Sequence, residues 1–344
     1  MSTRQLKALA DDSSALADCT FETVLELAQP FRLECGQILP SARIAIRLSG
    51  PEAAPVVVVL GGISAHRCPV ALPGEARDGW WQGVLGEQGV DILCSHRVLG
   101  LDYLGGGGAT TAPCNWGDAP ESFPAIDSLD QARIVVAALD ALGLARIEAV
   151  IGASYGGMVA LHLASRFGDR VSRAMVIASA HRPEPMALAR RYVQKKILAL
   201  AAQGGVSDRA AVEVARALAM TTYRSPAEFR KRFGGPGGAD SLASYLDHHG
   251  DKFAARFDAV AYARLIDSID THAVNPAAIR TPLTLVGFDS DEICPPSLMR
   301  ELSDLAPGTR GLVVLPSIYG HDAFLCERDG VAGTIAGFLN GAET

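Results

Sequence analysis

The chain has 344 residues, 49% of them hydrophobic, and a formal net charge of −7 at pH 7. Such a length can bury a substantial core, either as two domains or as one large α/β domain with an insertion. The acidic balance argues against nucleic acid and against an anionic membrane as partners, because both are bound by basic surfaces. No apolar run reaches the roughly 18 residues that would span a bilayer, and residues 1–16 lack the apolar stretch of a signal peptide. These features predict a cytoplasmic protein.

Seven cysteines are scattered along the chain. Their number is odd and no two are spaced as Cys-x-x-Cys, so neither a zinc site nor a redox pair is predicted. We expect most of them to be reduced and buried as small apolar side chains. No bound metal is expected.

Short apolar runs alternate with helical patterns over the first half of the chain. Residues 31–35 and 42–48 alternate apolar with polar side chains, as strands of an exposed antiparallel hairpin do. Residues 56–60 form an uninterrupted apolar run, typical of a strand covered on both faces within a parallel sheet. Further runs of this type lie at residues 91–94, 98–104, 148–151 and 174–177, with a helical segment at residues 128–142. This order predicts a mostly parallel sheet of right-handed strand–helix–strand units.

From about His181 the pattern changes to consecutive helical segments. They lie at residues 186–201, 208–220, 226–233, 242–246 and 259–268. Strands of the parallel type resume at residues 282–287 and 311–315, so both flanks of the helical stretch make sense only as one sheet. We therefore predict one α/β core formed by residues 1–180 and 281–344, with a helical lid inserted at residues 181–280.

A nucleophile motif, Gly152-Ala153-Ser154-Tyr155-Gly156, lies between a predicted strand and a predicted helix. The sharp turn of a nucleophile elbow leaves no room for side chains two residues before and after the serine, and Gly152 and Gly156 meet that need. The following helix directs its positive end at the turn, which favours negative charge on a bound acyl oxygen. We predict that Ser154 is the nucleophile of an enzyme that moves acyl groups.

A serine hydroxyl needs a base, and a third group must hold that base. In the α/β-hydrolase fold the chain order is serine, acid, histidine. His321 follows the last predicted strand, at the edge where α/β sheets place their sites, and is the predicted base. The loop after the preceding strand offers three acids, among which spacing does not decide: Asp289, Asp291 and Glu292.

The oxyanion hole of this fold uses the backbone amide after the nucleophile, which here belongs to Tyr155. The second amide comes from the loop after an early strand, and Leu60-Gly61-Gly62-Ile63-Ser64 is that loop. Its glycines let the backbone approach a ligand closely. Ile63 is the predicted second donor, with Gly62 as the alternative.

Four groups of residues, taken in chain order, carry a resemblance to a known protein family. They are Gly152 to Met158; Ala215-Arg216 with Thr222-Tyr223-Arg224-Ser225; Ser244-Tyr245-Leu246 with Gly250-Asp251-Lys252-Phe253 and Arg256-Phe257-Asp258; and Tyr319 to Leu325. In these groups the chain resembles the homoserine O-acyltransferase family of the α/β-hydrolase fold. The likeness covers most of the chain, from about residue 39 to about residue 338.

The resemblance implies roles for individual residues. Asp291 would be the acid of the triad, because it aligns with the family's aspartate before a Pro-Pro pair, and Ile63 would give the second oxyanion amide. Arg216 would bind the substrate carboxylate, Tyr223 would line that pocket, and Asp322 would hold the substrate amino group.

Arg216 and Asp322 could each have a simpler structural role instead. Arg216 and Tyr223 are seven apart and so share a helical face, and arginine suits a carboxylate because it donates two parallel bonds. The alternative for Arg216 is a surface pair with Glu213. The alternative for Asp322 is that it orients His321.

The chain departs from the family in the loop at residues 96–113, which the resemblance places beside the acyl site. Family members that use succinyl-CoA resemble one another in an arginine two residues after the triad aspartate, where this chain has Ile293. An apolar side chain there favours acetyl-CoA. If succinyl-CoA is the donor, Arg97 or Arg67 is the candidate to supply the positive charge that pairs with the succinyl carboxylate.

The resemblance therefore implies a homoserine O-acetyltransferase of methionine biosynthesis that works by a ping-pong mechanism, with acetyl-CoA as co-substrate and no bound cofactor. Three alternatives stay open: succinyl-CoA as donor, L-serine as acceptor, and an esterase or thioesterase on the same triad. The resemblance also implies a homodimer formed through the lid.

Overall fold

The computed structural model describes residues 20–72, 74–117 and 119–341. Eight strands form the central sheet in the order β1-β4-β6-β5-β7-β8-β9-β10. Their bounds are β1 (Phe21–Glu26), β4 (Arg43–Ser49), β5 (Val56–Leu60), β6 (Arg97–Leu101), β7 (Ile147–Ala153), β8 (Val171–Ile177), β9 (Leu283–Phe288) and β10 (Thr309–Leu315). β1 and β6 pair antiparallel to β4, and every other pairing in this sheet is parallel. The predicted mostly parallel sheet is confirmed.

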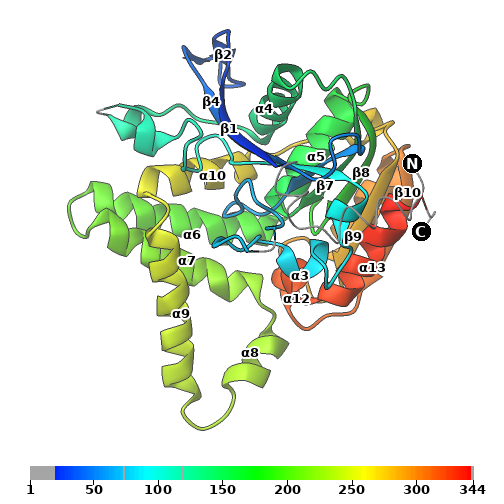
Figure 1. The fold of residues 1–344 in the computed structure, drawn as a ribbon. Coiled ribbons are helices and arrows are strands. Elements are labelled where there is room, and N and C mark those ends of the chain that lie inside the picture. Colours follow the sequence, from blue (N-terminus) through cyan, green and yellow to red (C-terminus); the bar gives the residue numbers. More distant parts are fainter. Residues whose placement is uncertain (1–19, 73, 118, 342–344) are drawn as a thin grey trace.

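Helices cover both faces of the sheet (Figure 1). The side chains of β5 alternate between two apolar clusters. Val58 belongs to the cluster that contains side chains of α4 (Ser128–Ala141), α5 (Tyr155–Arg166) and α11 (Pro296–Leu305). Val57 and Val59 pack on the opposite face. The helices of that second face are α3 (Gln82–Leu85), α12 (Ala323–Cys326) and α13 (Arg328–Leu339). An uninterrupted apolar run therefore belongs to a strand that is buried on both sides.

The exposed hairpin predicted for residues 31–35 and 42–48 is wrong. β2 (Phe31–Arg32) pairs with β3 (Ile38–Leu39) in a separate small sheet, whereas β4 joins the central sheet and is buried at six of its seven positions. The polar residue that suggested exposure, Arg47, is only 3% exposed and forms ion pairs with Glu22 and Glu75. The strand predicted at residues 91–94 is also wrong, because residues 92–94 form a single 3-10 turn after Asp91, whose φ is +47°.

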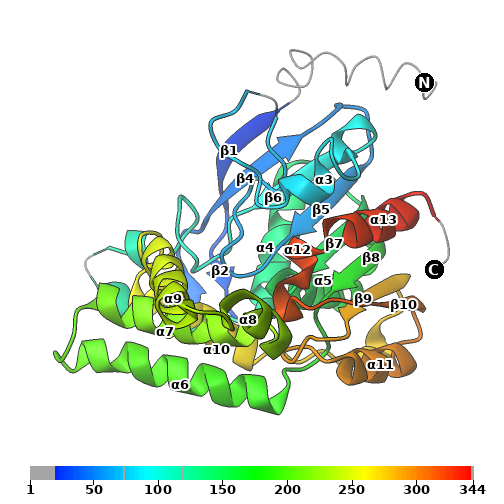
Figure 2. The ribbon, with the colours of Figure 1, turned by 90° about the horizontal axis from the view of Figure 1, so that it is seen from below.

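Five helices lie between β8 and β9: α6 (Pro185–Ala202), α7 (Asp208–Tyr223), α8 (Pro226–Phe233), α9 (Gly238–Ala254) and α10 (Ala259–Asp270). Figures 1 and 2 show them gathered on one side of the molecule, and in Figure 1 α8 and α9 extend farthest from the sheet. α9 is much longer than its predicted segment, because only its buried Tyr245, Gly250 and Phe253 contribute to an inward face. A Cβ on Gly250 would lie 2.7 Å from the carbonyl oxygen of Glu213, so glycine lets α9 approach α7 closely.

The cysteines differ from expectation. Cys19 lies outside the described residues, and the other six form no disulfide among themselves. Cys35 and Cys114 are exposed, Cys94 and Cys326 are half-buried, and only Cys68 and Cys294 of these six are buried, so the expectation that most are buried is wrong. Across the described ranges, no helix has both the length and the apolar character needed to cross a bilayer.

Candidate active site

Ser154 occupies a strained turn between β7 and α5. Its φ is +55° and its ψ is −120°, a conformation that costs a non-glycine residue free energy and that the surrounding chain must impose. A Cβ on Gly152 would lie 2.2 Å from the carbonyl oxygen of Gly156, and one on Gly156 would lie 2.3 Å from that of Leu60. Both positions therefore require glycine, as the elbow motif predicts.

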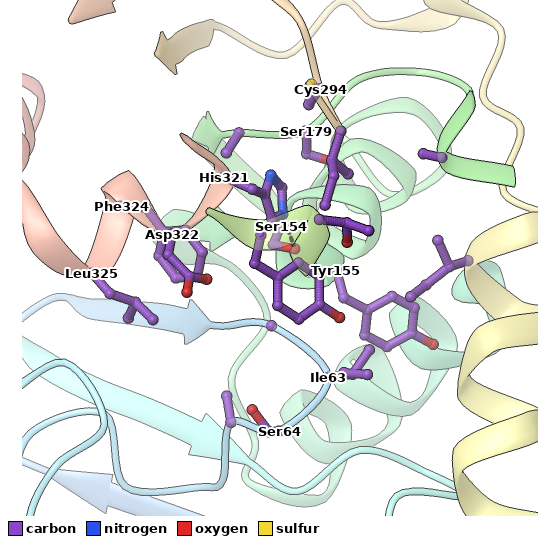
Figure 3. Close-up of a pocket in the computed structure, with 18 of the residues that line it drawn as sticks. Ile63, Ser64, Ser154, Tyr155, Ser179, Cys294, His321, Asp322, Phe324 and Leu325 are labelled. Carbon is purple, nitrogen blue, oxygen red and sulfur yellow. Dashed lines mark hydrogen bonds between the residues drawn. The ribbon is translucent and has the colours of Figure 1, made fainter. Parts of the chain in front are cut away.

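A chain of hydrogen bonds connects three side chains at this edge of the sheet. The Oγ of Ser154 lies 2.8 Å from Nε2 of His321 (Figure 3). Nδ1 of His321 lies 2.8 Å from Oδ2 of Asp291. The other carboxylate oxygen of Asp291 accepts hydrogen bonds from the amides of Ile293 and Cys294. His321 and Asp291 are buried, so the imidazole is held in one orientation toward the serine. This arrangement can transfer a proton from Ser154 as its oxygen attacks a carbonyl.

The three candidate acids have different partners in the structure. The carboxylate of Asp289 accepts a hydrogen bond from the amide of Ser317, and that of Glu292 forms a 3.0 Å ion pair with Arg190. Of the three, only Asp291 is hydrogen-bonded to His321. The geometry therefore agrees with the acid that the family resemblance implied.

The protonation of His321 is set by two opposing effects. Burial disfavours its charged form, but the charge and hydrogen bond of Asp291 outweigh burial, so its pKa is raised above the ordinary 6.5. A base must be neutral to accept the proton of Ser154.

We expect the rate of acyl-enzyme formation to fall on acidification with a midpoint above pH 6.5, because protonated His321 cannot accept a proton. The measurement is kcat/KM for 4-nitrophenyl acetate between about pH 5 and about pH 9, corrected for spontaneous hydrolysis in matched buffers. A midpoint below the ordinary value would show that burial, and not Asp291, dominates the titration of this histidine.

The predicted oxyanion residues Tyr155 and Ile63 line one cavity with Ser154 and His321. Their positions depend on Tyr103, which the sequence did not single out. The buried Tyr103 hydroxyl donates a 2.7 Å hydrogen bond to the carbonyl of Gly61, and its ring packs edge-on against the ring of Tyr155 at 4.9 Å. Tyr103 thus contacts both segments that carry the predicted oxyanion amides.

Replacing Tyr103 by phenylalanine keeps the ring contact and removes the hydrogen bond to Gly61. We expect kcat to fall about 5- to 10-fold, as loss of one hydrogen bond of about 1 kcal/mol predicts, with little change in KM for the acceptor. Tyr245→Phe is the matched control, since the buried Tyr245 hydroxyl has no hydrogen-bond partner among the described residues. Equal losses in both variants would show a general effect on folding, which thermal unfolding would also detect.

The loop at residues 96–113 does not border the cavity, contrary to expectation. None of its described residues lines that space, because side chains such as Tyr103 and Leu104 are part of the hydrophobic core. Arg97 and Arg67 do not line it either, and Arg67 forms ion pairs with Glu22 and Asp102.

Arg216 and Tyr223, both on α7, face the same cavity. The guanidinium of Arg216 lies 5.1 Å from the ring centre of Tyr223 and 4.6 Å from that of Phe253. Its Nε is buried and has no hydrogen-bond partner within the described part of the chain. Glu213 forms its ion pair with Arg209, and no ion pair between Glu213 and Arg216 is found among the described residues.

Asp322 lines the cavity and forms a 3.0 Å ion pair with Nε of Arg224. Burial raises the pKa of Asp322, although the charge of Arg224 opposes this. Both ring nitrogens of His321 are bonded to Ser154 and Asp291, so the hydrogen bonds that orient the imidazole come from those two residues. Arg224 was missed as a site residue, although it lies in one of the segments that carry the family resemblance.

One cavity of about 530 Å³ lies between the carboxyl ends of the strands and the helices α6, α7 and α9. The site side chains that border it are Ser154, His321, Arg216, Tyr223, Arg224 and Asp322. Cavities of this size hold small-molecule substrates. In the described residues, no group of three histidine, cysteine or acidic side chains is arranged to hold a metal ion.

The sheet, the elbow and the Ser154–His321–Asp291 arrangement define a protein of the α/β-hydrolase fold, and the family model described as alpha/beta hydrolase fold matches residues 55–327. The chain is 39% identical over 329 residues to a homoserine O-succinyltransferase of Xanthomonas campestris, across 93% of this chain and 84% of that protein. It is 34% identical over 352 residues to a homoserine O-acetyltransferase of Mycobacterium marinum, across 91% and 92%. A crystal structure of homoserine O-acetyltransferase from Staphylococcus aureus superposes with a TM-score of 0.80 at 25% identity, across 93% and 95%. The chain therefore belongs to the homoserine O-acyltransferase family, whose members are CoA-dependent acyltransferases.

Proposed function

We propose that this protein transfers an acetyl group from acetyl-CoA to the hydroxyl of L-homoserine. The observation that carries the proposal is that Arg216 and Asp322, a cation and an anion, face the same cavity as the bonded Ser154 and His321. A free amino acid carries both charges, whereas a simple ester carries neither. An esterase would have no use for this pair.

In the first half-reaction, Nε2 of His321 accepts the proton of Ser154 while Oγ attacks the thioester carbonyl. The amides of Tyr155 and Ile63 stabilise the oxyanion. The carbon–sulfur bond then breaks, the thiol receives the proton from His321, and CoA leaves an acetylated serine. Asp291 stabilises the imidazolium during this step.

In the second half-reaction, Arg216 binds the carboxylate of homoserine, Tyr223 lines that subsite and Asp322 holds the ammonium group. The homoserine hydroxyl gives its proton to His321 and attacks the acetyl carbon, and Ser154 leaves with that proton. The lid, proposed at residues 181–280 over a core of residues 1–180 and 281–344, excludes water that would hydrolyse the acyl-enzyme.

Acetyl-CoA is favoured because Ile293, which lines the cavity, is apolar. Succinyl-CoA is the second candidate, because the Xanthomonas relative named as a succinyltransferase has the higher identity of the two sequences compared. Arg190 also lines the cavity and pairs with Glu292, the neighbour of Ile293, so a cation for a succinyl carboxylate is present there.

One assay tests this function. The protein is mixed with acetyl-CoA or succinyl-CoA and with L-homoserine or L-serine, and thiol release is followed together with the acylated amino acid by mass spectrometry. We expect release over many turnovers only with acetyl-CoA and homoserine together, whereas acetyl-CoA alone should release no more than one thiol per enzyme. Continued turnover that does not depend on the amino acid would support a thioesterase instead, and preference for succinyl-CoA or serine would revise the donor or the acceptor.

We further propose that the protein acts in the cytoplasm, where methionine is made from homoserine, and that it forms a homodimer through the lid. Support for the dimer comes from exposed apolar side chains on α6, namely Met186, Tyr192, Val193 and Leu200. Sedimentation velocity distinguishes a dimer from a monomer.

A further inference from the structure

The cavity has the opposite charge balance to the whole chain. Seven lysine and arginine side chains line it against three carboxylates, whereas the chain has a formal net charge of −7. A basic cavity in an acidic protein concentrates anionic ligands. A single amino-acid carboxylate accounts for only one of these cations.

Most of the cavity cations already have partners. Four of them form ion pairs: Arg182 with Glu301, Arg190 with Glu292, Arg191 with Asp270, and Arg224 with Asp322. Arg216 is assigned above to the acceptor carboxylate. Lys252 and Arg256 remain, and neither has a carboxylate partner among the described residues.

Lys252 lies in the last turn of α9, and Arg256 follows four residues later in the chain, just beyond the end of that helix. Both line the cavity and both are exposed to solvent, so they lie where the cavity opens. Nη2 of Arg256 donates a 3.2 Å hydrogen bond to the carbonyl of Ser64, the residue after Ile63. Figure 3 shows Ile63 and Ser64 close together on this loop.

We propose that Lys252 and Arg256 form an anion site at the opening of the cavity that binds a phosphate group of the acyl-CoA donor. The proposal rests on the proposed function, because it takes acyl-CoA as the donor. The thioester must reach Ser154 inside the cavity, so the charged nucleotide end remains toward solvent. Two cations that line the opening and have no carboxylate partners suit a phosphate there, since charge-assisted bonds to phosphate are strong.

The test compares acetyl-CoA with S-acetyl-N-acetylcysteamine, a thioester that has the same acetyl group and no phosphate. In Lys252→Gln and Arg256→Gln, the ratio of kcat/KM for acetyl-CoA to that for the phosphate-free thioester should fall about 10-fold each, and further in the double variant. Arg256→Lys keeps the charge and should retain most of the ratio. Lys231→Gln removes an exposed lid cation that does not line the cavity and is the matched control.

Equal losses of kcat/KM with both donors would contradict the proposed anion site and show an effect on the lid or on the loop that carries Ile63 and Ser64. An unchanged ratio of the two kcat/KM values would contradict the site as well. Calorimetric titration of CoA tests the site without turnover: the Kd should rise about 10-fold in each Gln variant and become less sensitive to salt. Cation-dependent binding of CoA without any acyl transfer would overturn the proposed function and leave the site standing, whereas CoA that binds all variants equally would overturn the site alone.

Discussion

Replacing Ser154 by alanine is expected to lower kcat for thiol release from acetyl-CoA by at least about 10⁴-fold, as removal of the nucleophile does in related triads. Among the described side chains that line the cavity, the Ser154 hydroxyl is the only one hydrogen-bonded to His321. Without it no acyl-enzyme forms, and the ping-pong route is lost. The measurement is thiol release together with intact-protein mass spectrometry after mixing with acetyl-CoA.

Ser179→Ala is a matched control, since Ser179 is a buried serine that lines the same cavity, with a hydroxyl that has no hydrogen-bond partner in the described structure. We expect this variant to keep an acetylated intermediate and most of its activity. If Ser154→Ala retained an acetylated species or near-normal turnover, the acyl group would pass through another nucleophile or directly to the acceptor. The assignment of Ser154 would then be wrong.

The elbow was predictable because its requirements are local. Gly152 and Gly156 lie within two residues of Ser154, and the clash that excludes a Cβ at Gly152 arises from Gly156 in the same turn. The clash at Gly156 comes from Leu60 on β5, but the motif already contains glycine at that position. The buried run of β5 was predictable for a similar reason: five consecutive apolar residues fit only a strand that is covered on both faces.

The rest of the site depended on contacts between distant segments. Three acids compete in one loop, and the choice of Asp291 follows from the position of His321, 30 residues later. The burial of Arg47 depends on Glu22 and Glu75, which spacing along β4 does not reveal. The role of Tyr103 could not be predicted from the sequence, because it is a hydrogen bond to Gly61, 42 residues away.

Replacing Arg216 by methionine, which keeps much of the side-chain length and removes the charge, should lower kcat/KM for homoserine about 100- to 1000-fold. Losing a charge-assisted pair with a carboxylate costs about 2–5 kcal/mol. Acetylation of Ser154 should proceed at nearly the normal rate, because the donor does not use this guanidinium in the proposed mechanism. The two half-reactions are separated by following thiol release in a single turnover and then adding homoserine.

Two further variants make the Arg216 result specific. Arg216→Lys keeps the charge but cannot form two parallel hydrogen bonds, so its loss should be intermediate. Arg209→Met removes an exposed arginine from the same helix, where it pairs with Glu213, and should leave both half-reactions intact. If Arg216→Met slowed acetylation as much as transfer, the arginine would act by holding Tyr223 and Phe253 in place in the lid. A selective loss of transfer, with the acetyl-enzyme accumulating, would instead place the carboxylate of the acceptor at Arg216.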